Sequence, residues 1–163
     1  MRFLNSHKYS LLLYHPGLRR SFAQAYRDQM DEFQRLYGQP PTHVDGHRHK
    51  HLSTNVLIGN VIPRGQKIRR GFFFWPDEKG FLNRAYRRVV DWRVAQRYVT
   101  TDYFFSLAQC YEGERLERVL ALAEGSNVEI MCHPANRAER ALLLGDDFGR
   151  RLARLNLGSY RQV

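Results

Sequence analysis

Strand-like segments alternate with amphipathic helical segments along this chain, and this alternation restricts the fold more than any other feature. Apolar side chains recur three and four positions apart over Ser21–Tyr37 and again over residues 81–98 and 112–124, which predicts helices. The segments of strand-like composition between and after them are residues 42–47, 98–105 and 127–133. The order predicts an α/β fold with mostly parallel strands and a site at their carboxyl ends.

Two further segments complete the expected organisation. The pattern predicts a helix over residues 138–155 that is broken or kinked near Gly145, followed by a last short strand at residues 157–160. The apolar run Gly71–Trp75 lies between basic residues and Pro76, which indicates a buried strand or a loop over the core. Three polar strand ends converging on one mouth would resemble an α/β barrel.

The length and the cysteine content indicate one soluble domain. A chain of 163 residues, 43% of them hydrophobic, can bury one core, so we expect a single domain over residues 1–163. The chain has two cysteines, Cys110 and Cys132, too few for the disulfide framework of a small secreted fold. We therefore expect a cytoplasmic protein without a membrane span.

The net charge of +10 raises the question of a nucleic-acid partner. The positive charges are spread along the chain as pairs such as Arg19-Arg20 and Arg150-Arg151, without a basic tail or a long block. Arginine pairs of this kind are typical of solvated helix faces. We do not expect nucleic acid as the main partner, and an anionic substrate or lipid head groups remain alternatives.

Four of the seven histidines fall within nine residues. The odd-numbered positions from 43 to 51 are His43, Asp45, His47, His49 and His51, so four of these five alternating positions are histidine. In an extended strand every second side chain points to the same side, so these five groups would share one face. Such a face suits a metal site or proton transfer. The alternatives are an exposed basic strand edge and a histidine tract that binds metal incidentally.

A catalytic Zn²⁺ or similar ion is bound by imidazole and carboxylate groups. It commonly has three ligands from the protein. The ion lowers the pKa of a bound water and polarises a carbonyl group, which suits amide hydrolysis. The reaction also needs an acid for the leaving amine. His133, which precedes Pro134 at the end of a predicted strand, is a candidate for that acid, and a histidine with an ordinary hydrogen bond is the alternative.

Three segments in order resemble the YdjC-like carbohydrate deacetylases, a family that includes chitooligosaccharide and hopanoid-biosynthesis deacetylases. Residues 42–51 read THVDGHRHKH and are similar to the family's histidine signature. Residues 128–135 read VEIMCHPA and resemble its second signature, and residues 157–160 resemble its closing segment. The similarity extends from about Ser21 to the C-terminus.

The resemblance implies a partial, distorted (β/α) barrel and metal-dependent removal of an N-acetyl group from an amino sugar or related glycoconjugate. It implies a divalent metal ion, Zn, Mg or another, at His47, with His43, His49 and His51 as additional candidates. His133 and Asp45 would be the catalytic groups. The candidate substrate-binding residues are Arg69, Arg70 and Asp102.

This sequence also departs from the family pattern. We expect the family's Asp-Asp-Phe-Gly strand end, and a further histidine strand, in an N-terminal third that this sequence lacks. Residues 146–149 read DDFG, but their context predicts a helix N-terminus. The alternatives are therefore an impaired deacetylase, an inactive remnant with residual metal binding, and a basic interaction module. An incomplete barrel would also expose sheet edges, which favours self-association or a partner chain.

Overall fold

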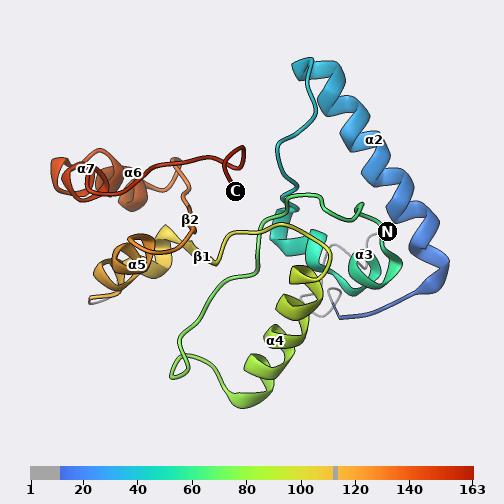
Figure 1. The fold of residues 1–163 in the computed structure, drawn as a ribbon, viewed down its shortest axis with the longest axis horizontal. Helices are drawn as coiled ribbons and strands as arrows, with labels where there is room; N and C mark the ends of the chain where they lie inside the picture. The colour runs from blue at the N-terminus through green and yellow to red at the C-terminus, as the bar shows by residue number, and fades with distance from the viewer. Residues whose placement is uncertain (1–11, 112–113) are drawn as a thin grey trace. The chain divides into compact units, whose positions relative to one another are not determined.

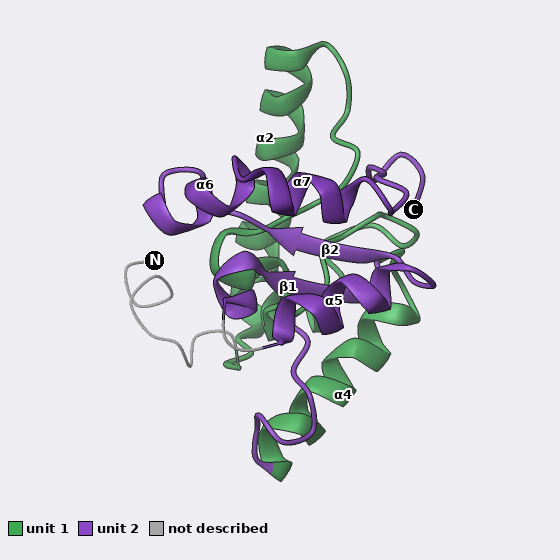
Figure 2. Cartoon of the chain, turned by 90° about the vertical axis from the view of Figure 1, so that its left-hand side faces the viewer, with its two compact units in different colours: residues 1–71, 81–100 green, residues 72–80, 101–163 purple. Residues whose placement is uncertain are grey.

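The computed structural model describes residues 12–111 and 114–163, which form two compact units (Figure 1). Unit 1 comprises the described residues within 1–71 and 81–100, and unit 2 comprises those within 72–80 and 101–163 (Figure 2). The chain therefore crosses from one unit to the other three times. The single domain over residues 1–163 stays a prediction.

Unit 1 is mainly helical. Its elements are η2 (Pro16–Leu18), α2 (Arg19–Tyr37), η3 (His47–Leu52), α3 (Thr54–Gly59) and α4 (Phe81–Ala95). The two long helices confirm the periodic patterns expected from the sequence, and α2 begins two residues earlier than Ser21 because the short turn η2 leads into it. Helix α2 ends at Gly38, whose φ of 68° is left-handed and therefore suits glycine.

The core of unit 1 contains short parallel extended segments as well as helices. Isolated parallel bridges join Val44 to Ile68 and Lys67 to Val99. The amide of Val44 donates to the carbonyl of Lys67 at 2.9 Å, and the amide of Ile68 donates to the carbonyl of Val99 at 2.9 Å. Ile68 is fully buried in an apolar cluster that includes residues of α3 and α4. These bridges tie Val44, within the histidine run, to Ile68 and tie Lys67 to Val99.

Unit 2 is a small α/β unit. Its elements are β1 (Tyr103–Ser106), η4 (Leu107–Cys110), α5 (Arg115–Ala123), β2 (Val128–Met131), α6 (Arg137–Leu143) and α7 (Asp146–Leu152). β1 and β2 pair in parallel, with Tyr103 opposite Val128 and Ser106 opposite Met131. Helix α5 connects them and contacts β2. Both strands therefore end at the same edge, where Ser106 and the segment after Met131 lie.

Aromatic and aliphatic side chains fill the core of unit 2. Phe105 of β1 and Phe148 of α7 are buried in one cluster, and Phe73 and Trp75 pack against it. The rings of Phe73 and Tyr103 meet edge to face at 5.0 Å. The run around Phe73 is thus a loop over the core, one of the two expected structures, with a backbone hydrogen bond from Phe73 to Phe104 at 2.8 Å.

Several sequence-based expectations differ from the structure. Helix α7 confirms that Asp146 begins a helix, and the break at Gly145 separates it from α6. The described part of the helix expected from residue 112 begins at Arg115; residues 112 and 113 lie outside the described residues. The prediction of a last strand was wrong, because residues 157–160 form no strand. The hydroxyl of Tyr160 in this segment instead donates a hydrogen bond to Glu129 at 2.5 Å.

Within the described ranges the named sheet has two strands, so the parallel α/β character is present but a barrel is not shown. A short strand forms only where a neighbouring strand satisfies its backbone, and in unit 1 that pairing is limited to single bridges. None of the helices in the described parts of the chain combines the length and apolar character needed to cross a membrane.

Candidate active site

The histidine run is not an extended strand. After Val44 the chain turns into η3, and two of its residues have left-handed backbone angles, Arg48 with φ 53° and His49 with φ 58°. The expected alternation on one face is therefore wrong for His47–His51. A left-handed residue other than glycine costs about 1 kcal/mol or more, and such strain is concentrated at functional sites.

His51 is held in the core of unit 1 by both of its ring nitrogens. The amide of Gly46 donates to Nδ1 at 2.8 Å, and Nε2 lies 2.7 Å from the carbonyl oxygen of Arg69. Because Nδ1 accepts, Nε2 carries the hydrogen and donates it to Arg69. The ring is 4% exposed, and burial lowers the pKa of His51, so it is neutral at pH 7. In this arrangement neither ring nitrogen offers a lone pair to a metal ion.

The guanidinium of Arg69 lies close to the histidine run. It is 5% exposed and lies 2.9 Å from Oδ1 of Asp45, whose side chain is 41% exposed. A buried guanidinium needs such a partner to offset its lost hydration. Burial, followed by the charge of Arg69, lowers the pKa of His49 to about 4. Burial likewise lowers the pKa of His43, against the opposing effect of Asp45. Arg69 and Asp45 thus form an ion pair beside histidines whose pKa values are lowered by burial.

A cavity of about 410 Å³ in unit 1 brings several of the expected site residues together. Asp45, His47 and His51 line it from the histidine run, and Lys50 lies beside them. Helix α2 contributes Phe22, Tyr26 and Gln29 to its wall. The cavity combines an aromatic wall with carboxylate, imidazole, ammonium and amide groups, a combination that suits a small polar ligand with an apolar face.

The metal centre implied by the resemblance does not fit the residues that the structure describes. Within residues 12–111 and 114–163 no group of three or more His, Cys, Asp and Glu side chains is placed to hold a metal ion. His51 has both nitrogens hydrogen-bonded, and Asp45 is paired with Arg69. His47 is exposed at the cavity. A mononuclear site takes three or four protein ligands, and the positive charge of Arg69 would also oppose a divalent cation.

His133 occupies the carboxyl end of β2 in unit 2. Its carbonyl accepts a hydrogen bond from the amide of Asn136 at 2.8 Å, which closes a turn with Pro134 in its second position. Asn136 then caps α6 by accepting from the amides of Ala138 and Glu139. Pro134 therefore restricts the backbone of the turn that separates His133 from α6.

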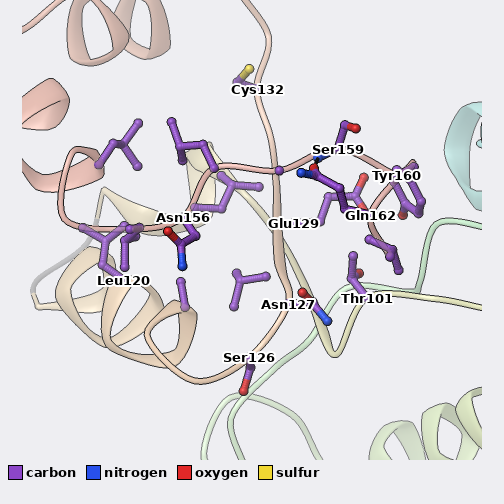
Figure 3. A pocket seen from close by; sticks show the side chains of 18 of the residues that line it. Thr101, Leu120, Ser126, Asn127, Glu129, Cys132, Asn156, Ser159, Tyr160 and Gln162 are labelled. Atoms are coloured by element: carbon purple, nitrogen blue, oxygen red, sulfur yellow. Dashed lines mark hydrogen bonds between the residues drawn. The ribbon is translucent and has the colours of Figure 1, made fainter.

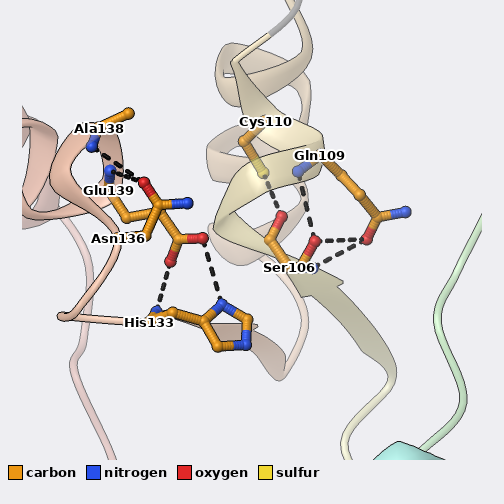
Figure 4. A network of polar contacts seen from close by, with 7 residues as sticks. All are labelled: Ser106, Gln109, Cys110, His133, Asn136, Ala138 and Glu139. Carbon is orange, nitrogen blue, oxygen red and sulfur yellow. Dashed lines mark hydrogen bonds and ion pairs between the residues drawn. The ribbon is translucent and has the colours of Figure 1, made fainter.

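A buried carboxylate contacts the imidazole of His133 (Figure 4). Glu139 is 1% exposed; Oε2 accepts the backbone amide of His133, and Oε1 lies 3.2 Å from its Nδ1. The ring itself is 55% exposed. Sequence reasoning missed Glu139. The signal was the spacing of Asn136 and Glu139, which is that of a capping box, a motif whose glutamate reaches back along the chain.

The other expected substrate-binding residues have partners within their own units. Arg70 pairs with Asp91 of α4 at 3.0 Å in unit 1. In unit 2 the carboxylate of Asp102 accepts the amide of Asn127 at 2.9 Å and so joins the segments that precede β1 and β2. The roles of Arg69, Arg70 and Asp102 in substrate binding stay predictions.

Unit 2 contains a second cavity, of about 430 Å³, beside β2 (Figure 3). Its wall is mainly apolar and comes from β2, α5 and the C-terminal segment, with Glu129 and Tyr160 among the polar residues. Cys132 lines this cavity, whereas its neighbour His133 does not. The imidazole of His133 therefore belongs to a different surface from this cavity.

A family model described as YdjC-like protein matches residues 2–154 of the chain. The match begins earlier than Ser21 and ends before residues 157–160. It includes the histidine run, the cavity beside it and the pair formed by His133 and Glu139. No curated protein and no solved structure matches the chain.

Proposed function

The chain belongs to the YdjC-like protein family, and from this premise we propose that it is a carbohydrate deacetylase that hydrolyses the N-acetyl group of an amino sugar or related glycoconjugate. The observation that carries the proposal is the exposed imidazole of His133 at the carboxyl end of a parallel strand, held by a buried carboxylate. An exposed imidazole held in this way supports a role for His133 as the general acid.

In the proposed reaction, water adds to the carbonyl carbon of the acetamide and the bond from that carbon to nitrogen breaks. The products are acetate and a free amine. The leaving nitrogen needs a proton, and protonated His133 would supply it from Nε2, because Nδ1 faces Glu139. Neutral His133 can take up the proton that water releases, which restores the acid.

The cavity of unit 1 supports a sugar as the ligand. Phe22 and Tyr26 provide an aromatic wall of the kind that lies against the apolar face of a pyranose ring. Asp45, Gln29 and Lys50 provide acceptors and donors for the hydroxyl groups of a sugar. We propose this cavity as a sugar-binding site of unit 1.

The divalent metal that accompanies this activity in the family is a separate part of the proposal. The described residues do not fit a metal centre, so we assign no step to a metal and no ligand beyond the candidate His47. Cytoplasmic location and self-association, or a partner chain, also stay predictions. Leu144 and Leu157 of unit 2 are 79% and 70% exposed, which is compatible with a partner surface.

Acetate release from N,N′-diacetylchitobiose tests the proposal. The full chain would be assayed with EDTA and, separately, with Zn²⁺, Mg²⁺, Mn²⁺, Co²⁺ or Ni²⁺. We expect release in at least one condition and a loss in kcat of about 100-fold or more in His133→Ala, because an acid contributes about that much. Cys132→Ser is the matched control, since it changes the neighbouring exposed residue. Full activity in His133→Ala would refute the assignment.

A non-catalytic family member is the second candidate. The observation that favours it is the lack, in residues 12–111 and 114–163, of a group of three or more side chains able to hold a metal. Well-folded protein that releases no acetate under any of these conditions, from this substrate or a panel of N-acetylated sugars, would support this candidate instead.

A further inference from the structure

We propose that Glu139 is a positioning residue that fixes the tautomer and the orientation of His133, so that Nε2 is the nitrogen presented to the substrate. This inference rests on the proposed function for its effect on rate, but its effect on the imidazole can be measured on the protein alone. The residue acts through His133 and does not itself contact substrate.

The burial of Glu139 is the first argument. Its side chain is 1% exposed, although glutamate is almost never fully buried without a partner. Both carboxylate oxygens contact His133, one at the backbone amide and one at the ring. A buried carboxylate with this pair of contacts fixes the peptide and the imidazole of the same residue together.

The hydrogen-bond chemistry is the second argument. An ionised carboxylate only accepts hydrogen bonds, so the contact of 3.2 Å from Oε1 to Nδ1 requires that Nδ1 carry a hydrogen. In the neutral ring the lone pair is then on Nε2. When the ring is protonated, the proton that can leave is also on Nε2. The pair therefore selects one nitrogen for proton transfer and keeps the other engaged.

The local backbone is the third argument. A capping-box glutamate usually accepts the amide of the N-cap residue, here Asn136. Glu139 instead accepts the amide of His133, three residues earlier. The turn through Pro134 brings that amide within reach, because the carbonyl of His133 is bonded to Asn136 at 2.8 Å. The first turn of α6 thus holds His133 through Glu139, and Asn136 caps the same helix.

Other charged or titratable groups are present near the pair. Burial, followed by the charge of Glu139 and by Cys110, raises the pKa of Tyr111. Cys110 is itself buried, and burial raises its pKa to about 11, so it is uncharged at neutral pH. Neither of these groups contributes a charge that would replace Glu139 at neutral pH.

The test is nitrogen NMR of the His133 ring in the full chain at pH 8, compared with Glu139→Gln and Asn136→Ala. We expect the Nδ1–H form in the natural protein. In Glu139→Gln an amide NH₂ replaces one acceptor, so we expect a shift toward Nε2–H. Asn136→Ala removes the helix cap without touching the ring, so it should lower stability but keep the tautomer.

The rate measurement completes the test. We expect kcat to fall by about 10- to 100-fold in Glu139→Gln with little change in KM, and Glu139→Asp to restore part of kcat and the Nδ1–H form. If Glu139→Gln does not fold, Glu139→Asp and the spectrum of the natural protein decide the question. A mainly Nε2–H ring in the natural protein, or an unchanged kcat in a variant with the altered tautomer, would overturn the proposal.

Absence of deacetylase activity in a protein that has the Nδ1–H ring gives a different result. It would refute the proposed function and would support the positioning of His133 by Glu139. The two failures are therefore distinguishable in one set of samples.

Discussion

Replacement of His51 by alanine tests whether this imidazole stabilises the fold or serves a metal. The substitution leaves the amide of Gly46 and the carbonyl of Arg69 without their partner, and both lie around a ring that is 4% exposed. Each buried polar group left unsatisfied costs about 1–3 kcal/mol. We therefore expect His51→Ala to lower the free energy of unfolding by about 2–6 kcal/mol.

The assay is urea unfolding of the full chain followed by circular dichroism, once with excess EDTA and once with zinc. We expect the midpoint to fall by a similar amount in both conditions, with little change in the slope. His51→Asn places an acceptor close to the position of Nδ1 and should recover part of the loss. His47→Ala is the matched control and should change stability by about 0.5 kcal/mol or less, because His47 is exposed.

Two results would refute this reasoning. If His51→Ala were as stable as the natural protein in EDTA, the two hydrogen bonds would not be stabilising the fold. If the loss appeared only in the presence of zinc, His51 would act as a metal ligand, and the ring would have to leave Gly46 or Arg69 to do so.

Three further predictions follow from the same structure. Gly46→Ala should lower the unfolding midpoint, because the added Cβ would lie 2.7 Å from the backbone nitrogen of His51; Gly80→Ala, with no atom within 4 Å, is its control. Unfolded histidine titrates near pH 6.5, whereas burial lowers the pKa of His49 to about 4, so the unfolded chain binds more protons between these values. The free energy of unfolding should therefore fall by about 1–2 kcal/mol, after allowing for solvent screening, as the pH falls from about 6.5 to 4. His49→Gln should reduce this dependence of stability on pH. If the variant showed the same dependence on pH as the natural protein, that would contradict the burial of the ring. Iodoacetamide should label Cys132 rapidly and Cys110 only after unfolding, as mass spectrometry would show, because Cys110 is buried and burial raises its pKa to about 11; equal labelling of both thiols in the folded protein would contradict this.

Helices were predictable from the sequence because their periodic apolar stripes are local signals. Arg19–Tyr37 and Phe81–Ala95 lie close to the expected ranges. The two paired strands were expected over longer ranges than Tyr103–Ser106 and Val128–Met131. A parallel strand depends on a distant partner, so composition marks the region but cannot fix where the pairing stops.

The histidine run illustrates what local alternation cannot predict. Its extended form was ruled out by contacts that close a turn, the bond from Gly46 to His51 and the bond from His51 to Arg69. The second of these spans 18 positions along the chain. Spacing within the run therefore indicated which residue types were present but not which of them would be enclosed in the core.

The pair in unit 2 was half predictable. His133 was identified from its place before Pro134, and the structure places it at the end of β2 as expected. Glu139 was missed because a glutamate in a helical pattern ordinarily faces solvent, and only the turn from His133 to Asn136 brings it back to the ring. Its spacing from Asn136 was the available clue.

If Glu139 positions His133 as proposed, the orientation of this imidazole depends on the local folding equilibrium of α6. This helix has seven residues, too few to persist alone in water, and it relies on Leu142 and Leu143 packing into the core of unit 2. Each opening of α6 withdraws the carboxylate, and the imidazole then samples all its rotamers and both tautomers. Hydrogen exchange at the α6 amides would measure the fraction of molecules in which α6 is open and His133 lacks the contact with Glu139.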